Sequence, residues 1–514
     1  MIYQFFTKHK FSTTTILQKM LFILLIINSM NFSVVHSQIE NRYWLVFDDR
    51  CENDNLDIIN LSICESYLEE LHQMGFYEKT TSRWLNAVTV NIKSTSDLNK
   101  LSSLPYIKEI KPVNRNWKLA SNTYKDVKRS SYALIQINPD TLYNSSLNGN
   151  GVKIGIIDAG FWKSNTNDYL KTIFEEDRVQ GFKDYVAGVE TSENIFFNSK
   201  RTGSDSHGTS VFRMIGGKDN HMRYGLADKA TYFLARTDNG DTENRSEEEN
   251  WIAALEWMVD SLDIHLINSS LGYSIGFDDP KENYSPEDMD GKTSMVTRAA
   301  EIAAEEKNVL LVVSAGNEGD NNKWKVVSAP ADARGVLSIG ATTKTGTKAS
   351  YSSIGPEQLN YVKPEVSCFS LFGTSFSAPV ITGLAACLWQ YKPSATAAEI
   401  RGAIIQSSWF YPYANNYIGY GVPDAAKAIH ILGDEVSKSS VSEIMAYDEK
   451  KIKVKEGNNE GTLLIAYHKE SETIVIKQEF IYLKEGTWLV KKPKKAISTT
   501  LWTGKRHIEV FWKK

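Results

Sequence analysis

Three short segments of the chain carry a carboxylate, an imidazole and a hydroxyl, the groups that together can activate a serine as a nucleophile. Asp158 ends an apolar run and precedes Ala-Gly, His207 opens the sequence HGTSV, and Ser375 lies within GTSFSAP. Each segment also has an ordinary structural explanation. Strand-Asp-Gly turns are common, a lone histidine is usually a satisfied polar side chain, and a serine before a helix is often its N-cap.

The local sequence around each residue nevertheless suits catalysis. A carboxylate at the end of a buried strand can orient an imidazole. A histidine that opens a helix beside a glycine exposes both ring nitrogens. Ser375 precedes a small-residue helix predicted over Val380–Trp389, and Pro379 is tolerated in a first helical turn. At a helix N-terminus, free N–H groups and the helix dipole favour a developing negative charge. We therefore predict Asp158, His207 and Ser375 as a catalytic triad.

The sequence around these residues predicts the strands and helices of an α/β fold, which must position them. Continuous apolar runs predict strands that are buried on both faces, and they lie at Val152–Ile157, Thr231–Ala235, His265–Asn268, Val309–Ser314 and Val336–Gly340. Helical patterns at Trp251–Ser261 and Thr297–Glu306 separate several of them. Alternating strands and helices predict a parallel sheet flanked by helices, with its chemistry in loops at the strand C-termini.

The order Asp, His, Ser within one α/β region is the subtilisin order. The region from about Ser131 to Leu432 resembles the subtilisin family of serine peptidases, through DAG, HGTSV, GTSFSAP, the VSAGNEG segment at Val313–Gly319 and the INSSLG segment at Ile267–Gly272. The resemblance implies that Asn317 is the side-chain donor of an oxyanion hole. It also implies a substrate-binding set of Ser270, Leu271, Gly272, Ala315 and Gly316. The insertion Asp288–Thr293 resembles exported subtilases of Bacteroidota.

The N-terminus has the pattern of a secretory signal. Lys8, Lys10 and Lys19 precede the apolar run Leu21–Ile27, which is shorter than the ~20 residues that a membrane-spanning helix needs. We predict a signal peptide over residues 1–37, with cleavage near Ser37 or Gln38, rather than a membrane anchor. The mature protein is then secreted or held at the cell surface, with no membrane span.

Residues 38–125 predict a small α+β unit where subtilases carry an inhibitory propeptide. Strands are expected at Tyr43–Asp48, Trp84–Ile92 and Tyr106–Val113, and helices at Ser62–Met74 and Ser96–Leu104. The polar stretch Asn114–Ser131 is predicted as a linker that contains the propeptide cleavage site, with Lys128-Arg129 as one candidate. The peptidase domain then spans residues 131–434.

Residues 438–514 predict a separate small β domain that is rich in lysine. Short alternating runs at Ile452–Val454, Thr462–Tyr467, Thr473–Ile476 and Ile508–Trp512 indicate its strands. The tail is a candidate sorting domain, and an adhesion module is the alternative interpretation.

These patterns predict a secreted serine endopeptidase that is made as a self-processing proenzyme. Its expected partners are polypeptide substrates and its own propeptide; a formal net charge of −4 gives no electrostatic reason to expect nucleic acid. A zinc enzyme is not expected, since there is no CxxC, HExxH or paired histidine motif. The serine mechanism requires no cofactor, although the resemblance leaves structural calcium open in acidic loops such as Asp278–Asp290. A catalytically silent module that kept the fold is the alternative; degenerate copies usually lose a triad member or the oxyanion Asn, and neither is lost here.

The chain has four cysteines, too few for a disulfide-built scaffold of this size. Cys51 and Cys64 lie close together in the N-terminal unit, and Cys368 and Cys387 flank Ser375. The spacing leaves open whether either pair is bonded.

Overall fold

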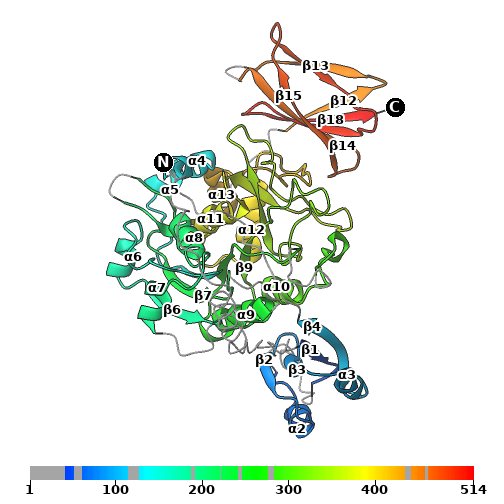
Figure 1. The fold of residues 1–514 in the computed structure, drawn as a ribbon. Helices are drawn as coiled ribbons and strands as arrows, with labels where there is room; N and C mark the ends of the chain where they lie inside the picture. The colour runs from blue at the N-terminus through cyan, green and yellow to red at the C-terminus, as the bar shows by residue number, and fades with distance from the viewer. Residues whose placement is uncertain are drawn as a thin grey trace, which may run out of the picture. The chain divides into compact units, whose positions relative to one another are not determined.

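The computed structural model describes residues 41–50, 61–113, 127–186, 192–219, 222–240, 246–275, 283–433, 441–457 and 461–513 (Figure 1). The predicted signal peptide over residues 1–37 lies outside these ranges, as do residues 114–126, in which part of the predicted linker falls. Among the described residues, no helix is long and apolar enough to cross a membrane.

The N-terminal unit is an α+β fold, as predicted, and its strand pairs β1–β4 and β2–β3 are antiparallel. Its sheet has the order β2-β3-β1-β4, and its elements are β1 (Asn41–Phe47), α2 (Glu65–Gln73), β2 (Glu78–Ser82), β3 (Ala87–Ile92), α3 (Thr95–Ser102) and β4 (Ile107–Val113). Leu71 of α2 packs into a core with Val88, Val90 and Leu101. Strand β2 was not predicted, because its sequence, EKTTS, has no apolar residue to show a strand period.

A seven-stranded parallel sheet of order β11-β10-β9-β8-β5-β7-β6 forms the centre of the fold. Its strands are β5 (Lys153–Asp158), β6 (Val179–Asp184), β7 (Thr231–Arg236), β8 (Leu266–Ser269), β9 (Leu310–Ser314), β10 (Leu337–Thr342) and β11 (Val366–Phe369). The five strands predicted from apolar runs are the five inner ones. All residues of β8, β9, β10 and β11 are buried, as expected for strands covered on both faces.

Helices cover this sheet (Figure 1). They are α4 (Val127–Gln136), α5 (Asp140–Asn144), α6 (Lys171–Glu175), α7 (Glu193–Asn198), α8 (His207–Gly216), α9 (Ser246–Glu256), α10 (Met295–Glu306), α11 (Ala378–Tyr391), α12 (Ala397–Ser407) and α13 (Ala425–Leu432). Helix α9 continues as a π-helical turn over Trp257–Ser261. Helix α11 is apolar nearly all round, which suits a helix enclosed by the core.

The predicted linker is wrong at its C-terminal end, because helix α4 begins at Val127 and includes Lys128 and Arg129. The apolar residues Ala133, Leu134 and Ile137 at and after the end of this helix are buried in the core of the parallel sheet. The helix therefore forms where its amphipathic second half packs, although the polar residues before it indicated a linker.

The C-terminal β domain, predicted from residue 438, has two sheets that enclose one core. The larger has the order β12-β18-β17-β14-β15, and the smaller pairs β13 with β16. Their strands are β12 (Ser442–Tyr447), β13 (Lys451–Lys455), β14 (Leu463–Lys469), β15 (Val475–Tyr482), β16 (Thr487–Lys491), β17 (Ser498–Trp502) and β18 (His507–Lys513). Trp488, Val490 and Val454 of the small sheet pack against Leu501, Val510 and Trp512 of the large one.

The cysteines divide into two kinds. Cys64 is disulfide-bonded, whereas Cys368 and Cys387 are free and buried. Cys51 lies outside the described residues. The pair that flanks Ser375 is therefore not a disulfide.

Candidate active site

Asp158 and His207, far apart in sequence, meet at the carboxyl end of the parallel sheet. His207 Nδ1 lies 2.7 Å from Asp158 Oδ1, and both side chains are buried. Asp158 is the last residue of β5, and its Oδ1 also accepts a 2.8 Å bond from the Ala159 N–H. The backbone bond fixes the carboxylate, and the carboxylate in turn fixes the orientation of the imidazole.

Glycine is required next to His207 because α8 begins against the Asp158 loop. A Cβ atom on Gly208 would lie 2.5 Å from Gly160 O and 2.9 Å from Asp158 Cβ. Such approaches are far shorter than a carbon contact allows, so any larger residue would push the imidazole away from the carboxylate. The HG pair in the sequence therefore has a steric cause.

Ser375 is buried in a 3-10 turn, Thr374–Phe376, that directly precedes α11. The sequence predicted a position at the helix N-terminus, and the serine instead lies one turn earlier, with Pro379 inside the first turn of α11. Its Oγ donates a 3.2 Å bond to Ser270 O, and Ser270 Oγ donates a 3.0 Å bond to Ser375 O. The nucleophile candidate is thereby held against the predicted substrate segment.

His207 Nε2, the nitrogen that faces away from Asp158, is buried and has no hydrogen-bond partner among the residues that the structure describes. The His207 ring lies 5.7 Å from the ring of Phe376, the residue after Ser375. Catalytic hydrogen bonds are often loose in the absence of substrate, so the arrangement is compatible with a serine activated by histidine.

The predicted oxyanion donor, Asn317, is tied to the turn that carries Ser375. Its Oδ1 accepts bonds from Thr374 N at 2.8 Å and from Thr374 Oγ1 at 3.1 Å. Because Oδ1 is fixed in this way, Nδ2 is directed to the other side of the amide. Gly316, before it, has a φ of 103°, a conformation that favours glycine.

The predicted substrate-binding residues fall into two segments that the structure joins. Ser270, Leu271 and Gly272 follow β8, whereas Ala315 and Gly316 follow β9. Between them runs Ser328–Ala329: Ser328 N donates to Ala315 O at 3.1 Å, and Ala329 pairs with Tyr273 as an antiparallel bridge. The structure thus brings all of the predicted site residues to one end of the sheet.

Sequence reasoning missed the residues that brace this site. Thr382 Oγ1 donates to Asn268 Oδ1 at 2.8 Å, and Asn268 Nδ2 donates to Ser270 Oγ at 3.1 Å, so α11 supports the segment beside Ser375. Thr374, within GTSFSAP, is a further bracing residue that was not predicted. Its position directly before the serine was the available signal.

The acidic loop considered for calcium does not fit a metal site in its described part. Asp288 Oδ2 accepts from Ser285 N, and Asp290 Oδ1 accepts from Lys292 N and Thr293 N. Across the described ranges, no three His, Cys, Asp or Glu side chains are arranged to hold a metal ion. These carboxylates close turns of their own loop, and we assign no step to a metal.

A parallel α/β sheet that presents an Asp–His pair beside a buried serine defines an α/β serine peptidase fold. Comparison with known proteins identifies its class: the subtilase family model matches residues 149–421, so the chain belongs to the subtilase family. The Bacteroidota peptidase S8 propeptide domain matches residues 47–129.

Relatives support the same assignment. Subtilisin NAT of Bacillus subtilis subsp. natto is 25% identical over 346 residues, which cover 65% of this chain and 77% of that protein. A subtilisin of Bacillus pumilus is 26% identical over 302 residues, 57% of this chain and 95% of that one. The structure of the epidermin leader peptide processing serine protease of Staphylococcus aureus superposes with a TM-score of 0.54 at 15% identity, covering 77% and 100% of the two chains. The chain is therefore a serine endopeptidase of the subtilisin type, with a propeptide domain before it.

Proposed function

We propose that this subtilase hydrolyses peptide bonds through an Asp158–His207–Ser375 triad and an acyl-enzyme, and that it is exported as a self-processing proenzyme. The observation that carries the proposal is the buried 2.7 Å contact between His207 Nδ1 and Asp158 Oδ1. It leaves Nε2, on the opposite side of the ring, to accept the serine proton. The family membership supplies the reaction type.

The mechanism follows from the roles of these groups. His207 Nε2 takes the proton of Ser375 Oγ as the oxygen attacks the peptide carbonyl, and Asp158 stabilises the imidazolium without being protonated. The Asn317 amide and the Ser375 backbone N–H bind the oxyanion of the tetrahedral intermediate. His207 then protonates the leaving amine, which leaves an acyl-enzyme. A water molecule, deprotonated by His207, attacks the ester and releases the acid and free Ser375. No cofactor takes part.

Contacts of the N-terminal unit support its role as an intramolecular partner. Arg42 pairs with buried Glu249 at 3.1 Å, and Ser82 donates to Glu256. Arg83 pairs with Asp260 at 2.6 Å. All three carboxylates lie on α9 or the π-helical turn after it, so one helical surface holds the propeptide sheet. We infer that this unit, over residues 38–125, remains bound until it is cleaved from the peptidase domain, residues 131–434.

Export is supported by the signal-like N-terminus together with the disulfide-bonded Cys64, since disulfides persist in oxidising compartments. The Bacteroidota-type propeptide match agrees with an extracytoplasmic enzyme. We therefore place the mature protein outside the cytoplasm, with residues 438–514 as its C-terminal domain.

The test compares the secreted wild type with Ser375→Ala and with the control Ser377→Ala. The Ser377 hydroxyl donates to Thr374 O within the same turn. The expected result is that wild type and Ser377→Ala mature, cleave a denatured protein and bind a fluorophosphonate label. Ser375→Ala should stay at precursor size and do neither. A wild type that matures but neither labels nor cleaves would refute the peptidase assignment, and an active Ser375→Ala would refute the triad.

A further inference from the structure

The two-stranded sheet of β13 and β16 has one buried face and one basic face. Ile452, Val454, Trp488 and Val490 alternate along the two strands and are buried against the larger sheet. Successive side chains of a strand point to opposite faces. The intervening residues therefore form the outer face, and the exposed ones are Lys451, Lys453, Lys455, Leu489 and Lys491.

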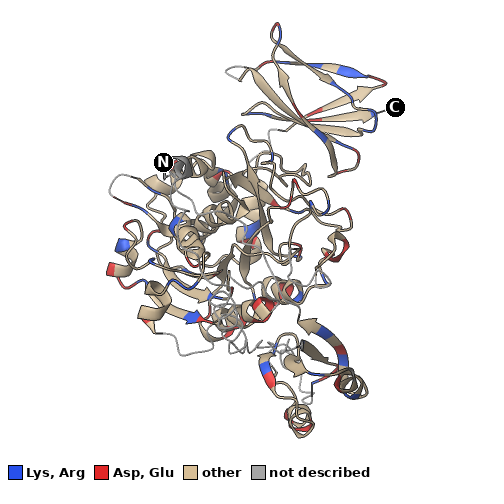
Figure 2. Cartoon of the chain, viewed as in Figure 1, with Lys and Arg blue, Asp and Glu red and all other residues tan. Residues whose placement is uncertain are grey.

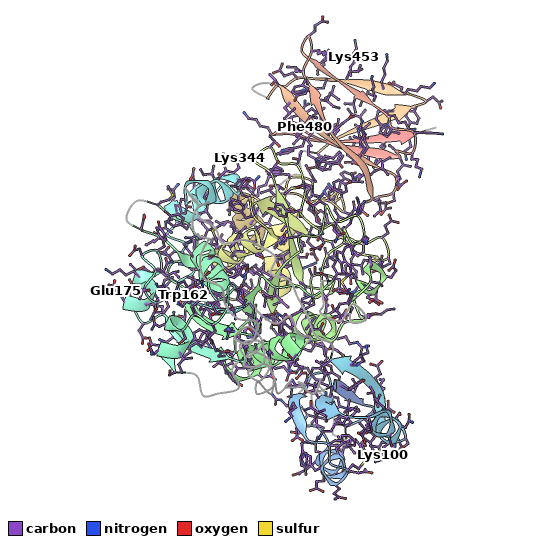
Figure 3. The ribbon with its side chains drawn as sticks, viewed as in Figure 1. Lys100, Trp162, Glu175, Lys344, Lys453 and Phe480 are labelled. Atoms are coloured by element: carbon purple, nitrogen blue, oxygen red, sulfur yellow. The ribbon has the colours of Figure 1, made fainter. Side chains whose placement is uncertain are left out.

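We call Lys451, Lys453, Lys455 and Lys491 the lysine face. Figure 2 shows lysine along β13, and Figure 3 labels Lys453 on this part of the domain. The lysines of β13 recur at every second residue, which spaces them by about 7 Å along the strand. Lys451 is directly opposite Lys491 in the antiparallel register. The result is a row of three ammonium groups along β13, with a fourth on β16 opposite the first.

The array has no compensating negative charge in the part of the chain that the structure describes. None of the four lysines makes an ion pair there, whereas Lys469, Lys477 and Lys495 of the same domain each pair with a glutamate. Like charges directly opposite one another destabilise a strand pair. Folding alone therefore gives no reason for Lys451 and Lys491 to face each other.

Charge is also divided unequally along the chain. Residues 441–514 contain 15 Lys and Arg against 10 Asp and Glu, a formal charge of +5, while the whole chain carries −4. The preceding 440 residues therefore carry −9. A basic C-terminal domain attached to an acidic enzyme can bind an anionic surface that repels the remainder of the chain.

The side chains of the lysine face favour one class of polyanion over the others. Single-stranded nucleic acid is bound by aromatic side chains that stack on bases, and this face has none. A membrane-bound segment needs a broad apolar surface beside its charges, and Leu489 is the one large apolar side chain on the face among the described residues of β13 and β16. A linear polymer of acidic sugars needs neither aromatic side chains nor an apolar surface on its partner. Its carboxylate or sulfate groups repeat along an extended chain and can pair with a row of lysines.

We propose that the lysine face binds a linear acidic polysaccharide and thereby retains the protease at a surface or matrix that carries one. The proposal is independent of the catalytic triad. Lysine on exposed edge strands also prevents aggregation, and the experiment must distinguish that role.

The test uses the full chain with Lys451, Lys453, Lys455 and Lys491 all changed to Gln. The matched control changes Lys171, Lys292, Lys344 and Lys427, which are exposed lysines of the peptidase region, to Gln and so loses the same charge. The probes are alginate and heparin, with neutral dextran, phosphatidylglycerol vesicles and single-stranded DNA as comparisons. Sedimentation and thermal unfolding report aggregation and stability.

The expected result is that wild type and control bind alginate and heparin, while the lysine-face variant binds them about tenfold or more weakly and with a shallower salt dependence. Equal binding by the variant and wild type would overturn the proposal, as would an equal loss in the control. Loss confined to vesicles or DNA would also overturn it in favour of those partners. Aggregation of the variant with unchanged polysaccharide binding would assign the lysines to edge protection alone.

Discussion

Thr374 holds the carboxamide of Asn317 through two hydrogen bonds to one atom. The Thr374 N–H and Oγ1 both donate to Asn317 Oδ1, at 2.8 Å and 3.1 Å, and Oγ1 also accepts from Gly316 N at 3.1 Å. Since Ser375 follows Thr374 directly, one residue links the nucleophile candidate to the oxyanion donor candidate. A donor that is fixed before substrate arrives needs no reorganisation during the reaction.

Thr374→Val, which keeps the shape and removes the hydroxyl, is expected to lower kcat by about tenfold, the equivalent of one hydrogen bond. KM should change little, because the amide acts on the oxyanion and not on the ground-state substrate. Asn317→Leu should lower kcat by about 10²–10³, the loss known from subtilisin itself, which belongs to this family. Steady-state kinetics on a peptide substrate measure both. A Thr374→Val effect confined to KM, or a fall only in thermal stability, would contradict the positioning role.

The propeptide contact through Glu256 should depend on pH. Burial raises the pKa of Glu256 to about 7, and its partners Ser82 Oγ and Arg83 N both belong to the N-terminal unit. Release of the N-terminal unit exposes the Glu256 carboxyl to water and lowers its pKa, so the bound state holds the proton more tightly than the released state does. Binding of the cleaved propeptide should therefore weaken as pH rises through about 7.

Inhibition of mature enzyme by added propeptide, measured between pH 5 and pH 8, checks this prediction. Glu256→Gln should flatten the dependence, since the amide is neutral throughout. Glu357→Gln, an exposed carboxylate on the peptidase region, is the control and should leave the dependence unchanged. Inhibition that strengthens with rising pH would contradict the assignment.

A buried charge network lies where the adjacent strands β10 and β11 begin. Lys363 is fully enclosed; its Nζ donates to Val336 O at 3.0 Å and to Glu365 Oε1 at 2.9 Å, and Arg401 also pairs with Glu365. Burial lowers the pKa of Lys363. Lys363→Met should destabilise the protein by about 1–3 kcal/mol, because it leaves the buried Val336 carbonyl without its donor, while Arg401 still pairs with Glu365. Denaturant unfolding of an inactive background measures it, with exposed Lys344→Met as a control that should change little.

The sequence was sufficient for the centre of the fold because its inner strands are continuous apolar runs. The edge strands β6 and β11 were not predicted: β6, VQGFKD, mixes polar and apolar residues, and β11 has only four residues. The mixed burial of β6 gives no strand period, and β11, although fully buried, is too short to show one. The same holds for β2, whose residues are mostly polar.

The candidate site could be predicted where its residues lie in short sequence motifs. It could not be predicted where residues distant in the sequence come together because two folded units pack against each other. Asp158, His207 and Ser375 lie in short segments whose neighbours, such as Gly208, have steric causes. The pairing of Arg42 with Glu249 joins residues 207 positions apart and depends on how two folded units pack, which no local pattern encodes. The position of Ser375 in a 3-10 turn before α11 likewise depends on its bonds with Ser270.

The two thiols that flank Ser375 should be inert, although they are close to it in sequence. Cys368 Sγ donates to Ser377 O at 3.3 Å, Cys387 Sγ donates to Leu147 O at 3.3 Å, and both residues are fully buried. Burial raises the pKa of both thiols, so the reactive thiolate is not populated at neutral pH. Iodoacetamide at pH 8 should leave the activity of the native enzyme unchanged and label neither residue, whereas both should be labelled in guanidinium. Peptide mass mapping measures which cysteines carry the label. Rapid modification of either cysteine in the native enzyme, with loss of activity, would show that the core beside the site opens to solvent and that the serine does not act in an enclosed site.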